Sequence, residues 1–169
     1  MNIFVLHKNP KLAAKFHCDK HVIKMIVESA QMLMSSYHVT QNEKALNHKD
    51  MYRLTHQKHP CTLWVNESLS NWKWLYELMN ELNEEYKSRY DKSVDHLSVT
   101  KINNVVNEAG LPNIEDIGLT DFAQAMPEQY RCEDAVKAYR EYYMGEKQNI
   151  AKWRNEIPDW FDISIKKKP

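Results

Sequence analysis

The chain has 169 residues, enough for one well-buried core, and 43% of them are hydrophobic. With only three glycines and six prolines, the composition argues against a sandwich of many short strands and against a disordered chain. The 23 basic and 23 acidic side chains cancel, so the chain lacks the overall positive field that is typical of duplex-DNA binders. These features predict a mainly α, single-domain protein over residues 1–165 with a basic tail at 166–169, and they favour a small ligand.

No apolar run approaches the roughly 18 residues that a membrane span needs, and no signal-peptide pattern precedes the first polar residues. The three cysteines, Cys18, Cys61 and Cys132, are scattered and show no spacing typical of a disulfide framework or a zinc site. We therefore expect reduced thiols and a cytoplasmic protein that contacts no membrane.

The first predicted elements are a short apolar run at 2–6, which is either a strand or an extended arm, and a long helix over 10–37. One side of this helix carries a polar stripe, formed by His17, Lys20, His21, Lys24, Glu28 and Gln31. Residues three and four apart project in one direction on a helix, so the stripe suits an anion or a polar ligand, although a solvated helix face would look the same. Asp19 points toward the apolar side, where a carboxylate needs partners, so we expect it to be buried and hydrogen-bonded.

Residues 38–60 are predicted to connect this helix to a second long helix over 62–90. Ser68 and Asn71 fall within the apolar stripe of the second helix, so they either cap neighbouring backbone or face a polar pocket. A shorter helix is expected over 98–109 with Gly110 as its C-cap, followed by an irregular segment at 112–127. Two further helical segments, 133–144 and 147–154, complete the predicted order of elements.

Two chemistries compete for the stripe. The i, i+4 spacing of His17 and His21 would allow a metal ion, but Lys20 and Lys24 would repel a cation on the same face, so neither a metal nor another cofactor is predicted. Phosphate fits better, because lysines and protonated histidines donate hydrogen bonds to oxyanions. We expect His56 and His59 of the connecting segment to approach the first helix as a wall of the same pocket. The predicted ligand-binding residues are His17, Lys20, His21, Lys24, Glu28, Arg53, His56, His59, Ser68, Asn71 and Arg89.

The run His17-Cys18-Asp19-Lys20-His21 resembles an uncharacterised family of small tailed-phage proteins. The same resemblance extends over most of the chain, through Lys24, Glu28, Gln31, His56, His59-Pro60, Trp64, Ser68, Asn71, Trp72, Arg89-Tyr90 and the segments 123–127 and 142–147. It implies a viral accessory protein in the cytoplasm of an infected cell.

The layout is also similar, more loosely, to the pyrimidine-dimer DNA glycosylase superfamily, which shares the apolar N-terminal arm, the charged motif on the first helix and the His-Pro element. That resemblance implies a freed N-terminal amine as nucleophile toward the sugar, with a glutamate and flanking basic residues on the first helix. Lys20 and Lys24 match the basic positions. His21 stands where the glutamate would align, and Asn2 is a poor residue for exposure by methionine removal.

Two functions therefore remain open. The first is a phage accessory protein that binds a nucleotide-like phosphorylated ligand, as a homo-oligomer that could sequester a host nucleotide immune signal. The alternative is an enzyme that uses the same helix, either a DNA base-excision enzyme of the pyrimidine-dimer glycosylase type, with DNA as its partner, or a nucleotide-processing enzyme.

Overall fold

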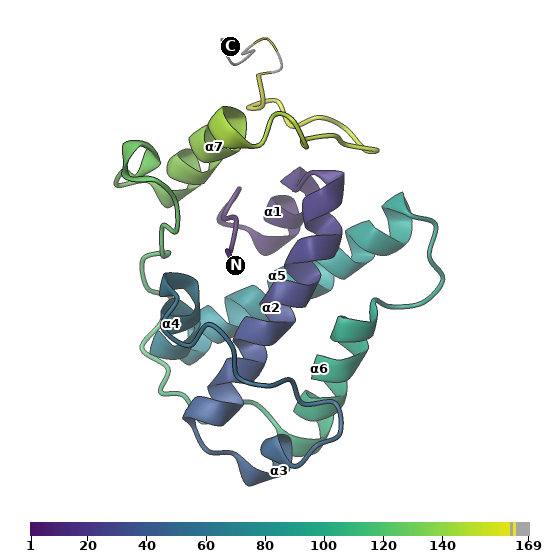
Figure 1. The fold of residues 1–169 in the computed structure, drawn as a ribbon, viewed down its shortest axis with the longest axis vertical. Helices are drawn as coiled ribbons and strands as arrows, with labels where there is room; N and C mark the ends of the chain where they lie inside the picture. Colours follow the sequence, from purple (N-terminus) through teal and green to yellow (C-terminus); the bar gives the residue numbers. More distant parts are fainter. Residues whose placement is uncertain (163, 165–169) are drawn as a thin grey trace.

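A computed structural model describes residues 1–162 and 164, and these residues form helices joined by loops, with no strand among them. The prediction of a mainly α fold is confirmed, and the run at 2–6 is an extended arm. In chain order the helices are α1 (Pro10–Phe16), α2 (Asp19–Val39), α3 (Glu43–Leu46), α4 (Pro60–Glu67), α5 (Leu69–Arg89), α6 (Leu97–Ala109), the 3₁₀ helix η1 (Glu128–Tyr130) and α7 (Ala135–Glu146) (Figure 1). None of the helices in the described part of the chain has the length and apolar character needed to cross a bilayer.

The long helices α2 and α5 cross and pack together at the centre of the molecule (Figure 1), as the sequence predicts. Trp72 of α5 is fully buried, and its indole N–H donates to the carbonyl of Leu33 on α2 at 3.0 Å. Its ring also meets Tyr37 edge to face, with ring centroids 6.4 Å apart. Buried aromatic residues of this kind supply most of the apolar area that holds two helices together.

The predicted single helix over 10–37 is wrong, because the chain leaves the helical conformation at His17. The Arg89 guanidinium lies at this break, where it donates to the carbonyls of Lys15 and His17 at 2.9 and 2.7 Å. The same guanidinium pairs with Asp19 at 3.2 Å, at the first turn of α2. A residue 72 and 74 positions away therefore satisfies the carbonyls of His17 and Lys15 at the end of α1, which local periodicity does not predict.

The predicted helix over 62–90 is also two helices, since Ser68 is extended (φ −152°, ψ 143°). The fully buried hydroxyl of Ser68 donates to Asp116 at 3.2 Å. The Asn71 side chain donates to Thr120 Oγ1 at 2.7 Å and accepts from the Thr120 backbone N–H at 3.0 Å. Both polar residues therefore anchor the loop after α6, which is the structural alternative left open by the sequence.

Three later predictions are confirmed. Helix α6 ends at Gly110, whose positive φ of 76° suits a C-cap. Residues 112–127 contain no helix, and α7 covers nearly the whole of the predicted segment 133–144.

The helix predicted at 147–154 is wrong. This segment turns once and then runs irregularly over the junction between α1 and α2. The Lys152 carbonyl accepts from the Asp19 backbone N–H at 2.8 Å, and the Trp153 indole donates to the Phe16 carbonyl at 3.0 Å. These long-range bonds use polar groups of the segment that a helix would have paired internally. The basic tail predicted at 166–169 lies outside the described residues.

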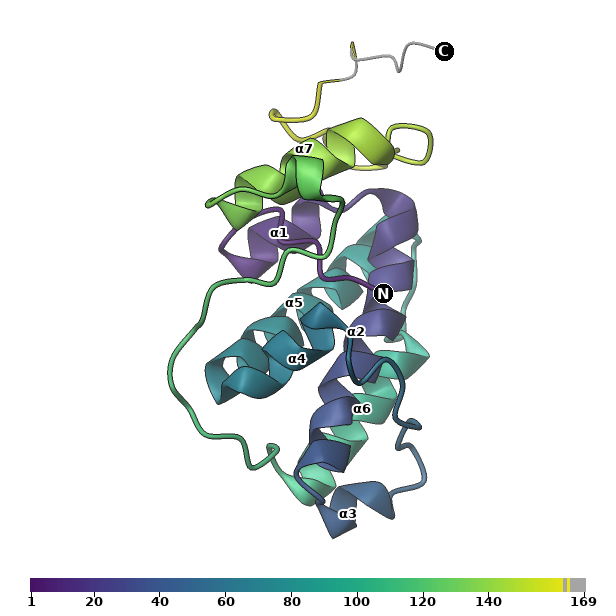
Figure 2. The same cartoon turned by 60° about the vertical axis from the view of Figure 1, so that its left-hand side comes forward.

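The N-terminal arm lies beneath α7, and its first residue lies next to α2 (Figures 1 and 2). Residues 3–6 are buried, and the arm is held at both ends by hydrogen bonds between side chains and main-chain carbonyls. The Arg140 guanidinium of α7 donates to the Leu6 carbonyl at 2.9 Å, and the side-chain amide of Asn2 donates to the Ala125 carbonyl at 2.8 Å. The arm thus delivers the N-terminus to the side of α2.

Candidate active site around the N-terminus

The N-terminal nitrogens face a single carboxylate, that of Glu28 on α2. The Asn2 backbone N–H donates to Glu28 Oε2 at 3.0 Å, and the Met1 ammonium nitrogen lies 3.8 Å from the same oxygen. Lys24, one turn earlier on α2, places its ammonium 3.8 Å from Glu28 Oε1. The Glu28 side chain is 14% exposed and that of Lys24 is 65% exposed, so the carboxylate is sheltered while the lysine reaches solvent.

The first two residues are fixed in place by their side chains. The Met1 side chain is only 2% exposed and its sulfur lies 3.8 Å from the Thr62 hydroxyl, although Met1 as a whole is half-buried. The exposed part of Met1 is therefore its main chain, which carries the amine. Asn2 Oδ1 accepts from the Tyr139 hydroxyl at 3.1 Å, and the Asn2 amide is the donor to Ala125 described above. The side-chain contacts of Met1 and Asn2 therefore fix the position of the N-terminal amine, and a fixed position favours its reaction with a bound substrate.

His59 forms the neighbouring wall. It is the N-cap of α4, and its Nδ1 accepts from the Cys61 backbone N–H at 3.1 Å. Burial lowers the pKa of His59, and the positive N-terminal amine lowers it further, while Glu28 acts in the opposite direction. His59 therefore lies within electrostatic reach of both groups. His56 is exposed, with a φ of 50°, and its carbonyl accepts from the His59 backbone N–H at 3.0 Å.

His17 and His21 do not share an exposed stripe with the lysines. Both are buried, with 0% and 4% exposure. His17 Nδ1 lies 2.6 Å from the Ala13 carbonyl, and burial lowers the pKa of His17 to about 4. His21 Nδ1 lies 2.7 Å from the Tyr143 hydroxyl, and its ring stacks on Phe4 with centroids 4.5 Å apart. Burial, followed by the positive charges around it, lowers the pKa of His21 to about 3. Both rings are neutral at pH 7, because burial in the core disfavours their protonated forms.

The other predicted residues are dispersed. Lys20 is exposed on α2, one turn before Lys24, and Arg53 is exposed in the loop between α3 and α4. Arg89 is committed to the α1–α2 junction and also pairs with Glu85 at 2.8 Å, while Ser68 and Asn71 anchor a loop as described above. Of the predicted set, Lys24, Glu28 and His59 come together at the N-terminus. Within the described ranges 1–162 and 164, no group of three or more His, Cys, Asp and Glu side chains is placed to hold a metal ion.

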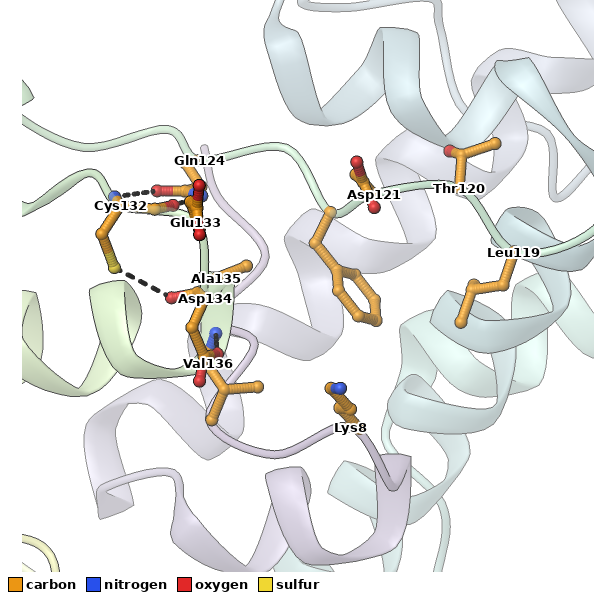
Figure 3. A pocket seen from close by; sticks show the side chains of 11 residues that line it. Lys8, Leu119, Thr120, Asp121, Gln124, Cys132, Glu133, Asp134, Ala135 and Val136 are labelled. Carbon is orange, nitrogen blue, oxygen red and sulfur yellow. Dashed lines mark hydrogen bonds between the residues drawn. The ribbon is translucent and has the colours of Figure 1, made fainter.

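A separate hollow of about 710 Å³ lies between Lys8, the segment 119–124 and the start of α7. Figure 3 shows Lys8 and Leu119 on its walls, and Gln124 accepts a hydrogen bond from the backbone N–H of Cys132 at 3.1 Å. None of the residues predicted from the sequence lines it.

The sequence alone did not identify the carboxylate that lies beside the N-terminal amine or the residues that hold the N-terminus. His21, the residue aligned with the glutamate, is buried on Phe4, and the carboxylate beside the amine is that of Glu28, two turns later. Asn2 and Tyr139, which hold the N-terminus, carry no local signal, apart from the polar character of Asn2 beside the apolar run 3–6.

No curated protein and no solved structure matches this chain. A family model described as pyrimidine dimer DNA glycosylase matches residues 1–97, which is more than half of the chain. The matched range contains the N-terminal arm, α2 with Lys24 and Glu28, and α4 with its N-cap His59. The chain therefore belongs to the pyrimidine dimer DNA glycosylase family.

Proposed function

We propose that this protein is a DNA base-excision enzyme in which the α-amino group at Met1 attacks the sugar of a damaged nucleotide. The observation that carries the proposal is the 3.8 Å approach of the Met1 ammonium to Glu28, at the exposed end of an otherwise buried arm. Family membership supports the same reaction, since members of this type use an N-terminal amine and a helix glutamate.

An α-amino group suits this chemistry better than a lysine does. Its ordinary pKa of about 7.7 to 8.0 lies more than two units below the 10.4 of lysine, so a useful fraction of α-amines is unprotonated at neutral pH. Amines of this kind form Schiff bases with sugar carbons at the aldehyde oxidation level. The fixed position of Met1 then replaces a bimolecular encounter with a local one.

In the proposed reaction the amine lone pair attacks C1′, and the bond between C1′ and the base breaks. The electron pair of that bond leaves on the base, which takes a proton from solvent. Glu28 accepts a proton from the newly bonded nitrogen and returns it to the ring oxygen O4′, which opens the sugar and leaves an iminium between Met1 and C1′. A carboxylate in this position also stabilises the positive charge that develops on the sugar.

Lys24 and His59 are assigned supporting roles. Lys24 is exposed and close enough to Glu28 to bring a backbone phosphate toward the amine. His59 has its Nδ1 occupied by the Cys61 N–H, and its lowered pKa keeps the ring neutral near pH 7, so it adds no charge that would compete with the amine for Glu28.

The test is borohydride trapping on duplex DNA that contains an abasic site, because borohydride reduces an iminium to a stable covalent adduct. We expect the unaltered protein to form the adduct and peptide mass spectrometry to locate it at Met1. Glu28→Gln should slow adduct formation by about 10² to 10⁴-fold, the usual contribution of a positioned acid–base group. Glu77→Gln, which changes an exposed acid on α5, is the matched control and should have no effect.

Extension of the N-terminus by Gly-Ser moves the free amine away from Glu28 and should abolish trapping. Adduct formation that survives this extension, or an adduct located on a lysine, would refute the assignment of the nucleophile.

The nucleotide-sequestering hypothesis stays a prediction, as does the homo-oligomer that accompanied it. It relied on protonated His17 and His21 beside the lysines, and both rings are buried and neutral at pH 7. Incubation with cyclic and ADP-ribose nucleotides, followed by heat release and mass spectrometry, separates the two functions. A sequestering protein returns a retained nucleotide intact.

A further inference from the structure

A second lysine approaches the face that carries Lys24, from a part of the chain outside the family match. The C-terminal end of α7 lies beside the N-terminal half of α2 in both views (Figures 1 and 2). Lys147 is the C-cap of α7, and its ammonium lies 5.0 Å from the centre of the Tyr142 ring. A cation over an aromatic face is attracted by the negative face of the ring. Tyr142 therefore restricts where the Lys147 ammonium can lie.

The Tyr142 ring is itself braced by the N-terminal arm. It lies nearly parallel to Phe4, with centroids 6.2 Å apart and planes inclined by 22°. Phe4 stacks in turn on His21 of α2. After burial and the neighbouring His17, both Lys147 and Lys24 contribute to the lowered pKa of His21, so both ammonium groups lie within electrostatic range of this imidazole. The stack connects the end of α7 to the arm that carries the amine.

The lysines on the N-terminal half of α2 and at the end of α7 are only partly paired with carboxylates. Lys24 has Glu28 at 3.8 Å. Among residues 1–162 and 164, neither Lys20 nor Lys147 forms an ion pair with a carboxylate. Glu146, next to Lys147 in sequence, accepts a hydrogen bond from the Tyr130 hydroxyl at 3.0 Å. The neutral net charge of the whole chain thus conceals a local group of lysines beside the candidate active site.

We infer that Lys147 and Lys24 bind phosphates of the DNA backbone on the α7 side of the N-terminal amine, with Tyr142 as the positioning residue for Lys147. This inference rests on the proposed function, because it takes DNA as the substrate. An ammonium held by a ring loses little side-chain freedom when it binds a phosphate, and each phosphate contact releases condensed counterions from the duplex. Residues beyond 97 would then contribute directly to substrate binding.

The experiment measures DNA affinity at several salt concentrations, with a short duplex that contains a tetrahydrofuran analogue of an abasic site, by fluorescence anisotropy. A lysine that contacts a phosphate contributes about 0.9 to the slope of log K against log salt. Lys147→Ala and Lys24→Ala should each lower the slope by about that amount and weaken binding about tenfold at physiological salt. Tyr142→Phe keeps the ring and should bind like the unaltered protein, whereas Tyr142→Leu should resemble Lys147→Ala.

The matched control is Lys137→Ala, which removes an exposed lysine from the opposite end of α7 and should leave the slope unchanged. An unchanged slope in Lys147→Ala, or an equal change in Lys137→Ala, would overturn the inference. Borohydride trapping distinguishes the two proposals. If the unaltered protein is trapped but Lys147→Ala leaves the salt slope unchanged, only the phosphate contact is refuted. If Lys147→Ala lowers the slope but the unaltered protein is not trapped, only the proposed chemistry is refuted. Failure of the unaltered protein to bind the duplex overturns both.

Discussion

Replacement of Arg89 by alanine should be among the most destabilising single changes in this protein. The side chain is 2% exposed and donates to two backbone carbonyls, those of Lys15 and His17, while it pairs with Asp19 and Glu85. Loss of one partner of a buried ion pair typically costs about 3 to 5 kcal/mol, because the other charge is left uncompensated. The two stranded carbonyls add to this cost, although water can reach part of the opened junction. We expect a loss of about 4 kcal/mol in the free energy of unfolding.

The assay is equilibrium urea unfolding followed by tryptophan fluorescence and by circular dichroism. Arg89→Lys should recover only part of the loss, since an ammonium cannot reproduce the planar fork that reaches two carbonyls and a carboxylate together. Asp19→Ala, which removes one acceptor from the same junction, should cost about 1 to 3 kcal/mol. The sequence predicted that Asp19 is buried and hydrogen-bonded, and this placement is confirmed by its 14% exposed side chain and its pairing with Arg89.

Arg53→Ala is the control for a lost arginine, because Arg53 is exposed and its removal should change stability by less than about 0.5 kcal/mol. If the free energy of unfolding of Arg89→Ala lies within about 1 kcal/mol of that of the unaltered protein, the guanidinium does not hold the α1–α2 junction and the prediction is refuted.

Two further predictions concern the arm and the buried imidazoles. Tyr139→Phe keeps the ring but removes a buried hydroxyl that lies 2.7 Å from the Ala123 carbonyl and 3.1 Å from Asn2 Oδ1, and that accepts from the Ala125 N–H at 3.2 Å. Because these partners lose a hydrogen bond, the change should cost about 1 to 3 kcal/mol in stability and should slow borohydride trapping more than it weakens DNA binding; an equal effect on both would show a general loss of structure instead. The pKa values of His17 and His21 are lowered from 6.5 to about 4 and about 3, so unfolding releases rings that take up protons more readily, and stability is expected to fall as pH drops below about 6.5. At pH 5 each ring should account for about 2 kcal/mol of that loss, and His21→Phe should make the pH dependence of urea unfolding shallower; an unchanged dependence would place the titrating group elsewhere.

The sequence predicts most of the helices because the buried positions of α2, α5, α6 and α7 recur at helical spacing, and that spacing reflects local burial. It does not predict the breaks at His17 and Ser68. Both breaks are stabilised by residues far along the chain, Arg89 in one case and Asp116 in the other. Helical periodicity continues across such a break, since the apolar residues on either side still face the same core.

The sequence predicts part of the candidate site, namely the part that depends on local helix geometry. Lys24 and Glu28 lie one turn apart on a helix, so their proximity follows from local geometry. His59 was proposed as a pocket wall because histidines are frequent both in the first helix and in the connecting segment. The Met1 amine joins them only through the tertiary path of the arm, which depends on Tyr139 and Ala125. His21 lies on the same helix as Lys20 and Lys24, as expected, but its ring is covered by Phe4 of the arm and Tyr143 of α7, which local periodicity does not reveal.

The burial of the arm beneath α7 has a consequence for the order of events during synthesis. Two of the Asn2 side-chain hydrogen bonds are made with residues 123 and 137 positions later, so the first residues to leave the ribosome complete their contacts only near the end of synthesis. Until α7 has been translated, the Asn2 side chain lacks its contact with the Tyr139 hydroxyl, and only part of the network that places the amine beside Glu28 can form. A fragment that ends at residue 97 would include Met1, Lys24 and Glu28 but lack the hydroxyl of Tyr139 and the carbonyl of Ala125. Such a fragment would therefore carry the chemical groups of the site with only part of the contacts that hold them together.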